Sequence, residues 1–260
     1  MTQENGISGR RQQVAEVIAQ KGFVQLTELA SLLGVSESTV RRDLEALERV
    51  GGIRRTHGGA LCLAEPAAAK LGFADRQATA VAEKRAIAAA IARMIPDDQT
   101  VILDGGTTCC HVAAALAGRR LSVITNSVPI AALLGGEINT EVTLIGGYLY
   151  PRTGVALGEM AESMLASLRA AQLVLSCAAV SDDGLFNVNQ MMTAVQRRMI
   201  EVADEVILAV DHSKFGRRAI SPLCPWSEID VVVTDWLTEA ETRQRLQERG
   251  VKVVVAEAPA

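Results

Sequence analysis

Short runs of valine, isoleucine and leucine recur along most of the chain, and segments with helical periodicity lie between them. Strands are expected at 100–104, 121–126, 141–147, 173–177, 205–211, 230–235 and 251–256, and helices at 83–95, 109–117, 128–134, 160–168, 193–203 and 239–249. Continuously apolar strands that alternate with helices are typical of a mainly parallel sheet covered on both faces. We therefore expect a doubly wound α/β domain here.

The beginning of the chain has a different pattern, typical of three short helices followed by a strand between glycines. Apolar residues at helical spacing predict a first helix over 10–21. Thr27 is expected to cap a second helix that Gly34 ends, and Ser36 to cap a third helix that runs to about Val50. These residues predict a small helical domain ahead of the α/β domain.

The third helix carries apolar residues on one side and polar residues on the other. Val40, Leu44 and Leu47 form a narrow stripe that faces a core. Two helices joined by a glycine-bearing turn, the second with small hydroxyls at its start and arginines outside, are typical of a helix-turn-helix. Such a helix lies in the major groove, where arginine can bind guanine through two donors. The candidate DNA contacts on this helix are Ser36, Ser38, Thr39, Arg41 and Arg42.

The next segment, GGIRRTHGG at 51–59, is typical of the wing of a winged helix, because glycine pairs flank a short basic strand. Arg54, Arg55 and His57 are then expected to contact phosphate or the minor groove. The first 60 residues hold eight Lys and Arg against seven Asp and Glu, a net charge of +1. Since the whole chain has a net charge of −4, the remaining residues carry −5. A solvated charged face, with Arg41 paired to Glu45 along the helix, is the alternative. The arrangement favours binding of double-stranded DNA.

Polar residues follow three of the expected strands in the α/β domain. These are the segments 104–108 (DGGTT), 126–127 (NS) and 211–214 (DHSK). Ligands of such folds bind beyond the carboxyl ends of the strands. Glycines let the backbone approach a ligand, and the free amides at a helix start attract an anion. With the hydroxyls of Thr107, Thr108 and Ser127 and the charge of Lys214, the pattern predicts a cradle for a phosphate and a polyol. Ordinary strand-to-helix turns and a solvated lysine are the alternative.

The cysteines and the overall composition exclude several other classes of protein. Cys109, Cys110 and His111 are adjacent, so their side chains diverge on a helix and cannot converge on one metal ion. We expect buried thiols, no metal and no cofactor; the remaining cysteines, Cys62, Cys177 and Cys224, form no C-x-x-C pair. No apolar run is long enough to span a membrane, and no signal peptide is visible. A cytoplasmic protein without a membrane partner is expected.

Two sets of motifs resemble the DeoR family of bacterial transcription regulators. The segment 28–60, ELASLLGVSESTVRRDLEALERVGGIRRTHGGA, resembles its DNA-binding head, and ILDGGTT, VITNS, LIGG, DHSKFG and VVVTD resemble its C-terminal domain. The resemblance implies a body related in fold to ribose-5-phosphate isomerase, sensing of a phosphorylated sugar, and action as a repressor in a homo-oligomer, dimer or tetramer. The effector contacts that it implies are Asp104, Gly106, Thr107, Thr108, Thr125, Asn126, Ser127 and Lys214.

The expected domains are a winged helix-turn-helix at 1–60, a linker at 61–76 and an effector-binding and oligomerisation domain at 77–260. A sugar-phosphate isomerase is the rival class, with Asp182 and Asp183 as candidate carboxylates. The chain lacks the isomerases' glycine-rich, lysine-bearing segment and its Glu-Lys base, so a non-enzyme is expected. An activator that responds to an unphosphorylated ligand is a further alternative. Residues 190–195, where many family members carry acidic residues, leave the effector's identity open.

Overall fold

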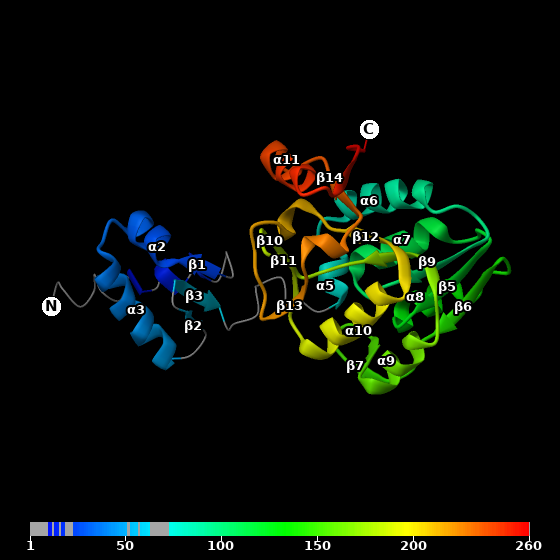
Figure 1. Cartoon of the computed structure of the whole chain (residues 1–260), viewed down its shortest axis with the longest axis horizontal. Coiled ribbons are helices and arrows are strands. Elements are labelled where there is room, and N and C mark those ends of the chain that lie inside the picture. Colours follow the sequence, from blue (N-terminus) through cyan, green and yellow to red (C-terminus); the bar gives the residue numbers. More distant parts are fainter. Residues whose placement is uncertain are drawn as a thin grey trace. The chain divides into compact units, whose positions relative to one another are not determined.

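The structure is a computed structural model that describes residues 10–11, 13–15, 17–18, 23–50, 53–56, 58–62 and 73–259. It divides into two compact units, 1–70 with 216–220 and 71–215 with 221–260. Figure 1 labels the helices and strands of both units. The two units are described separately.

The first unit is a winged helix-turn-helix. Its described residues between 10 and 18 are helical. The further elements are β1 (Phe23–Gln25), α2 (Leu26–Leu33), α3 (Glu37–Val50), β2 (Ile53–Thr56) and β3 (Gly59–Cys62). The three strands form an antiparallel sheet in the order β1-β3-β2, so β2 and β3 make the wing hairpin that the glycine-flanked basic segment predicts.

The turn between α2 and α3 forms as the sequence predicts, but the start of α2 does not. Gly34 ends α2 in the left-handed conformation, with φ at 63°, and Ser36 caps α3 by accepting from the Thr39 amide at 3.3 Å. The expected cap by Thr27 is wrong, because α2 already begins at Leu26 without a side-chain cap. The Leu26 amide donates to the Gly58 carbonyl at 2.9 Å, so the chain passes directly from the sheet into the helix.

The second unit is built on a seven-stranded sheet, all of whose pairings are parallel, in the order β15-β14-β12-β9-β4-β5-β6. The strands are β4 (Gln99–Leu103), β5 (Leu121–Thr125), β6 (Thr140–Leu144), β9 (Ala170–Leu175), β12 (Ala203–Ala209), β14 (Val231–Asp235) and β15 (Lys252–Ala256). The helices are α5 (Phe73–Gln77), α6 (Val81–Met94), α7 (Thr107–Leu116), α8 (Val128–Leu134), α9 (Glu159–Ala166), α10 (Gln190–Glu201) and α11 (Ala240–Glu248), with short 3₁₀ turns η1 (His212–Lys214) and η2 (Trp226–Glu228). The prediction of a parallel α/β domain is confirmed.

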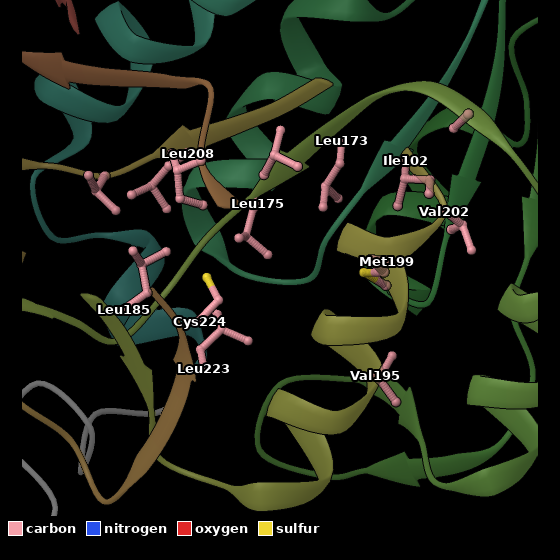
Figure 2. Close-up of a cluster of buried hydrophobic side chains, with 14 of the residues drawn as sticks. Ile102, Leu173, Leu175, Leu185, Val195, Met199, Val202, Leu208, Leu223 and Cys224 are labelled. Carbon is pink, nitrogen blue, oxygen red and sulfur yellow. The ribbon is translucent and has the colours of Figure 1, made fainter. Parts of the chain in front are cut away.

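Alternating side chains of the central strands enter two separate cores, one on each face of the sheet. In β9, Leu173 and Leu175 belong to one core and Val174 to the other. Figure 2 shows the first core, where Val195 and Met199 of α10 lie among side chains of the sheet. Helices α9, α10 and α11 contribute to this core, and α6, α7 and α8 to the opposite one. The sheet is therefore covered by helices on both faces.

The direction of strand addition reverses next to β4. The chain adds β5 and then β6 on one side of β4, and later places β9 on the other side before adding β12, β14 and β15. The connections after β4 and β9 lead to helices on opposite faces, because α7 belongs to one core and α10 to the other. In open α/β sheets, ligands bind at such a switch point, beyond the carboxyl ends of the strands.

Short antiparallel strands that the hydrophobic pattern does not predict surround this sheet. They are β7 (Tyr148–Tyr150) paired with β8 (Val155–Leu157), and β10 (Ala179–Ser181), β11 (Gly184–Asn187) and β13 (Ser221–Cys224) in a second sheet. Strand β3 ends at Cys62 and α5 begins at Phe73, both inside the range expected as a linker. None of the helices described is long and apolar enough to cross a membrane.

Candidate functional site

The outer face of α3 carries an exposed arginine, Arg42. Val40 and Leu44 are fully buried on the inner face, as the periodicity predicts, whereas Ser38 and Arg42 are exposed. Within the described residues, Arg42 has no ion-pair partner. An exposed, unpaired guanidinium one turn after the helix start is well suited to contact a base edge or a phosphate.

Hydroxyl groups cluster at the start of the same helix. The hydroxyl oxygen of Ser36 lies 2.8 Å from that of Ser38 and 2.9 Å from that of Thr39. All three side chains are at least partly exposed. Small hydroxyls that can each donate or accept give this end of α3 several hydrogen-bonding options for a nucleic acid.

The arginine of the wing is held against α3 by two acids. Arg55 donates to Glu48 Oε2 through Nε at 2.8 Å and to Glu45 Oε1 through Nη1 at 2.7 Å. The pairing of Arg41 with Glu45 that the alternative interpretation offered is wrong: Glu45 is bound by Arg55, and Arg41 lies 3.8 Å from Glu37 instead. His57 and the side chain of Arg54 lie outside the described part of the chain.

A buried carboxylate joins the first helix of this unit to α3. Asp43 is 2% exposed and accepts from Arg10 Nε at 2.6 Å and from Arg11 Nε at 3.1 Å. Burial raises the pKa of Asp43, but the two arginines outweigh it and hold the pKa below its ordinary value. The sequence gives Arg10 and Arg11 no such role, since their partner lies more than 30 residues away.

At the carboxyl edge of the seven-stranded sheet, where β4, β5, β9, β12 and β14 end, Asp104 is the centre of a hydrogen-bond network. One carboxylate oxygen accepts from the Gly105 amide at 2.7 Å. The other accepts from Ser176 N at 3.1 Å, Ser176 Oγ at 2.9 Å and Gln196 Nε2 at 2.8 Å. Asp104 follows β4 and Ser176 follows β9, so this network bridges the switch point. Burial raises the pKa of Asp104 to about 6, although these donors oppose the shift.

The loop after β4 brings backbone close to neighbouring segments. A Cβ placed on Gly105 would lie 2.1 Å from Cγ1 of Val155, and one on Gly106 would lie 2.7 Å from Oγ of Ser176. Gly106 also has φ at 132°, a conformation that favours glycine, and begins α7 without a side-chain cap. The first amides of α7 have no partner within the helix, so they are available to an anion.

The hydroxyl groups predicted at this edge have different surroundings. Thr107 and Thr108 begin α7, are 8% and 6% exposed, and make no side-chain hydrogen bond to another described residue. Thr125 is fully buried and donates to the Leu103 carbonyl at 2.7 Å. Ser127, also fully buried, caps α8 by accepting from Ile130 N at 3.4 Å. Thr125 and Ser127 thus hold the loop in place, whereas Thr107 and Thr108 have hydroxyls to offer a ligand.

Lys214 lies in η1, after β12, and is partly exposed. It has no ion-pair partner in the part of the chain that is described. Burial raises the pKa of the Cys177 thiol after β9, and the charge of Lys214 partly opposes this rise. Lys214 follows β12, and β9 separates this strand from β4. A lysine without an ion-pair partner among the described residues, at the same edge of the sheet as the first amides and hydroxyls of α7, is suited to a phosphate dianion.

Sequence reasoning missed several polar residues of this edge. His212 Nδ1 lies 3.0 Å from Asp235 Oδ1, and Asp235 is fully buried. Lys84 is 4% exposed and donates to the carbonyls of Arg76 and Thr79, both at 2.5 Å. Burial lowers the pKa of Lys84. The presence of a lysine in the alanine-rich segment 83–95 could have drawn attention to Lys84. No feature of the sequence around Ser176 or Gln196 indicates their bonds to Asp104.

The cysteines and the two aspartates that the sequence raised as candidates have the following surroundings. Cys109 and Cys110 are buried thiols, and burial raises the pKa of Cys110 to about 11. Among the described residues, no three His, Cys, Asp or Glu side chains are arranged to hold a metal. Asp182 and Asp183 form the exposed turn between β10 and β11, in which Ser181 pairs with Gly184.

Comparisons with known proteins agree with this division of the chain. Residues 10–65 match the DeoR-like helix-turn-helix domain, and residues 79–236 match the DeoR C-terminal sensor domain. The HTH-type transcriptional repressor CsqR of Escherichia coli is 35% identical over 95% of this chain and 94% of its own length. The glycerol-3-phosphate regulon repressor of the same species is 34% identical over 87% of this chain and 90% of its own.

Among solved structures, ribose 5 phosphate isomerase A from Neisseria gonorrhoeae is similar over 54% of each chain, with 14% identity and a TM-score of 0.37. The two domain matches together span most of the chain, and the curated relatives align along nearly their whole length. The chain belongs to the DeoR family of transcription regulators, with a DNA-binding domain of that family followed by its sensor domain.

Proposed function

We propose that the protein is a transcriptional repressor that binds an operator through α3 and the wing, and that a phosphorylated sugar bound at the carboxyl edge of the sensor sheet controls this binding. The observation that carries the DNA-binding part is the exposed, unpaired Arg42 on the outer face of α3. Relatives that align along nearly the whole chain are named repressors. Arg41, Arg54, Arg55 and His57, with the hydroxyls at the start of α3, are the further proposed DNA contacts.

Replacing Arg42 tests the DNA contact. Arg42→Ala removes a bidentate donor, so we expect it to weaken binding to an operator selected from random duplexes by about 1–3 kcal/mol, and to relax preference at one base pair. Fluorescence anisotropy against the selected and a scrambled duplex measures both effects. Arg93→Ala, at an exposed arginine of α6 in the sensor unit, is the matched control and should bind normally. Unchanged operator affinity in Arg42→Ala would contradict the assignment.

The ligand part of the proposal rests on the loop at the switch point. Free amides at the start of α7, the hydroxyls of Thr107 and Thr108, and the unpaired charge of Lys214 all suit a dianion. Asp104, Gly106, Thr125, Asn126 and Ser127 complete the proposed site; Asp104, Thr125 and Ser127 position the loop through the bonds they make within it. One relative is a repressor of a glycerol-3-phosphate regulon, which supports a phosphorylated ligand here too.

Isothermal titration with sn-glycerol 3-phosphate, ribose 5-phosphate and fructose 6-phosphate, each beside its unphosphorylated parent, tests the ligand class. We expect one or more phosphates to bind and the parents to bind far more weakly. Lys214→Ala should weaken phosphate binding by roughly ten- to a hundredfold, because a hydrogen bond to a charged group contributes about 1.5–3 kcal/mol. Lys252→Ala, an exposed lysine at the beginning of β15, is the control. Normal binding by Lys214→Ala would refute the cradle.

The proposal also includes self-association, because a ligand in the sensor can control DNA binding by changing how two heads are spaced. A homodimer or tetramer is therefore proposed. Light scattering of the full chain, with and without operator, measures the assembly. A monomer that binds the operator at full affinity would refute this part alone.

A further inference from the structure

Two buried polar atoms, one after β5 and one in the β7–β8 hairpin, have no partner in the part of the chain that is described. They are Oδ1 of Asn126, in a residue that is 2% exposed, and Oγ1 of Thr153, in a residue that is 6% exposed. Buried polar groups are hydrogen-bonded in the great majority of native structures, and an unpaired one loses its hydration without compensation. Two such atoms therefore call for a specific partner.

Thr153 lies in the turn that joins β7 to β8, and this hairpin is fastened to the end of β5. The amide of Ala156 donates to the Asn126 carbonyl at 2.7 Å, and the Val128 amide donates to the Gly154 carbonyl at 2.9 Å. Val155 forms a β-bridge with Ser127. Ala156 thereby lies beside Asn126, and the turn that carries Thr153 is held against the start of α8, next to the same segment.

The same hairpin packs against the loop after β4. Cγ1 of Val155 lies 2.1 Å from where a Cβ on Gly105 would be, so only a glycine there allows the two segments to approach this closely. Asn126 and Thr153 thus belong to segments that converge on the loop that leads to Thr107 and Thr108. Nearby residues of these two segments, Ser127 and Val155, both lie against Gly105, two residues before Thr107.

The two atoms differ from the phosphate-binding groups in what they can bind. The side-chain amide of Asn126 donates through Nδ2 to the Ala156 carbonyl at 3.0 Å, which fixes its orientation and leaves Oδ1 as an acceptor. The phosphate group of a sugar phosphate, as a dianion, carries only acceptors and cannot satisfy this oxygen. A hydroxyl group can donate to Oδ1 of Asn126, and Oγ1 of Thr153 can either donate to it or accept from it.

We propose that Asn126 and Thr153 form the hydroxyl-reading part of the effector site, so that the β7–β8 hairpin selects a polyhydroxylated phosphate over a bare one. The inference rests on the proposed function, since the ligand occupies the same loop. It adds Thr153 as a specificity-determining residue, and it assigns Asn126 to a ligand hydroxyl and not to the phosphate.

Thr153→Val tests this, because valine has the shape of threonine and lacks its hydroxyl. Without ligand, the melting temperature should stay unchanged or rise, since an unsatisfied hydroxyl is removed from the interior. Affinity for the sugar phosphate that the wild-type protein binds best should fall about tenfold, and affinity for inorganic phosphate should not change. Thr153→Ser should restore sugar-phosphate binding. Thr143→Val, at an exposed position of β6, is the control for the effect of a threonine-to-valine substitution.

A ligand lacking one hydroxyl sharpens the test. If ribose 5-phosphate binds, 2-deoxyribose 5-phosphate or another monodeoxy form should bind the wild-type protein about tenfold more weakly, and should bind Thr153→Val and wild type equally. Normal sugar-phosphate affinity in Thr153→Val, or an equal loss for inorganic phosphate, would overturn the inference. Wild-type protein that binds only unphosphorylated sugars would refute the proposed phosphate instead. In that case the valine and serine variants are compared on the unphosphorylated sugar, and their affinities decide the role of Thr153.

Discussion

Asp43 in the DNA-binding unit and Asp104 in the sensor unit are both nearly fully buried, yet opposite kinds of partner satisfy them. Asp43 is bound by the guanidinium groups of Arg10 and Arg11, so its charge is neutralised. Asp104 is bound by amides, a hydroxyl and Gln196, which are neutral. The first arrangement ties two helices together, and the second leaves a costly charge at the edge of the sheet that we propose binds the ligand.

The two carboxylates therefore respond to pH in opposite directions. The pKa of Asp43 is lowered in the folded chain, so the stability that this group contributes is present at neutral pH and is lost as pH falls through its folded pKa. The pKa of Asp104 is raised to about 6, so its contribution is present below about pH 4 and is lost as pH rises through about 6. Acid should weaken the head through Asp43 and strengthen the sensor through Asp104.

Removing the arginines gives the largest expected effect. Arg10→Ala with Arg11→Ala leaves Asp43 buried without a countercharge, which should destabilise the DNA-binding unit by about 3 kcal/mol. Hydrogen exchange of the amides in α2 and α3 of the full chain measures it. Adding Asp43→Asn should recover most of the loss. If Arg10→Ala/Arg11→Ala exchanges as slowly as wild type, the ion pairs do not stabilise the unit.

The pH dependence of the sensor is the next largest effect. The raised pKa of Asp104 should lower the unfolding free energy of this unit by up to about 3 kcal/mol between pH 4 and pH 7. Chemical unfolding followed by the fluorescence of Trp226 and Trp236, both in this unit, reports it. Asp104→Asn should abolish this decrease in unfolding free energy between about pH 4 and pH 7. Asp204→Asn, at an exposed aspartate, should leave the decrease unchanged. An identical pH profile in Asp104→Asn and wild type would show that the buried carboxylate is not its source.

Salt concentration has the smallest expected effect on stability, and it should affect the DNA-binding unit through Asp43 but not the sensor unit through Asp104. Arg11 is 41% exposed, so raising NaCl from 0.1 to 0.5 M should screen its pairing with Asp43 and lower the stability of the head by about 0.5 kcal/mol. The neutral donors around Asp104 give no such dependence. The variant lacking Arg10, Arg11 and Asp43 should be insensitive to salt in the same exchange measurement. Equal salt effects on that variant and on the wild-type head would contradict the expectation.

Long apolar strands and amphipathic helices were the predictable part of the fold. Each strand of the parallel sheet falls on an apolar run, and Val40 and Leu44 face inward as their spacing predicts. Strands such as β7 and β8 were missed, because three residues are too few to show a period and their pairing depends on contacts with Asn126 and Ser127. The cap at Thr27 was wrong because a contact with Gly58, distant in sequence, sets the start of α2.

The candidate site was predictable in its loops and not in its network. Glycines and hydroxyls after β4 lie within one short segment, so local reasoning proposes Thr107 and Thr108 as candidates. Gln196 bonds to Asp104 across 92 residues, and no local pattern pairs them. Burial also decides roles that residue type alone leaves open: Thr125 and Ser127 have the same kind of hydroxyl as Thr107, yet theirs are used within the protein.

The network around Asp104 also constrains how this sensor can diverge. Asn187 donates to Gln196 Oε1 at 3.0 Å, and Gln196 donates in turn to Asp104, so the orientation of each group fixes the next. Replacing any one of the three leaves a buried amide or carboxylate facing an unsuitable neighbour. During evolution these positions should therefore be inherited as a unit, and a relative that has changed residue 196 should carry a compensating change at 104 or 187.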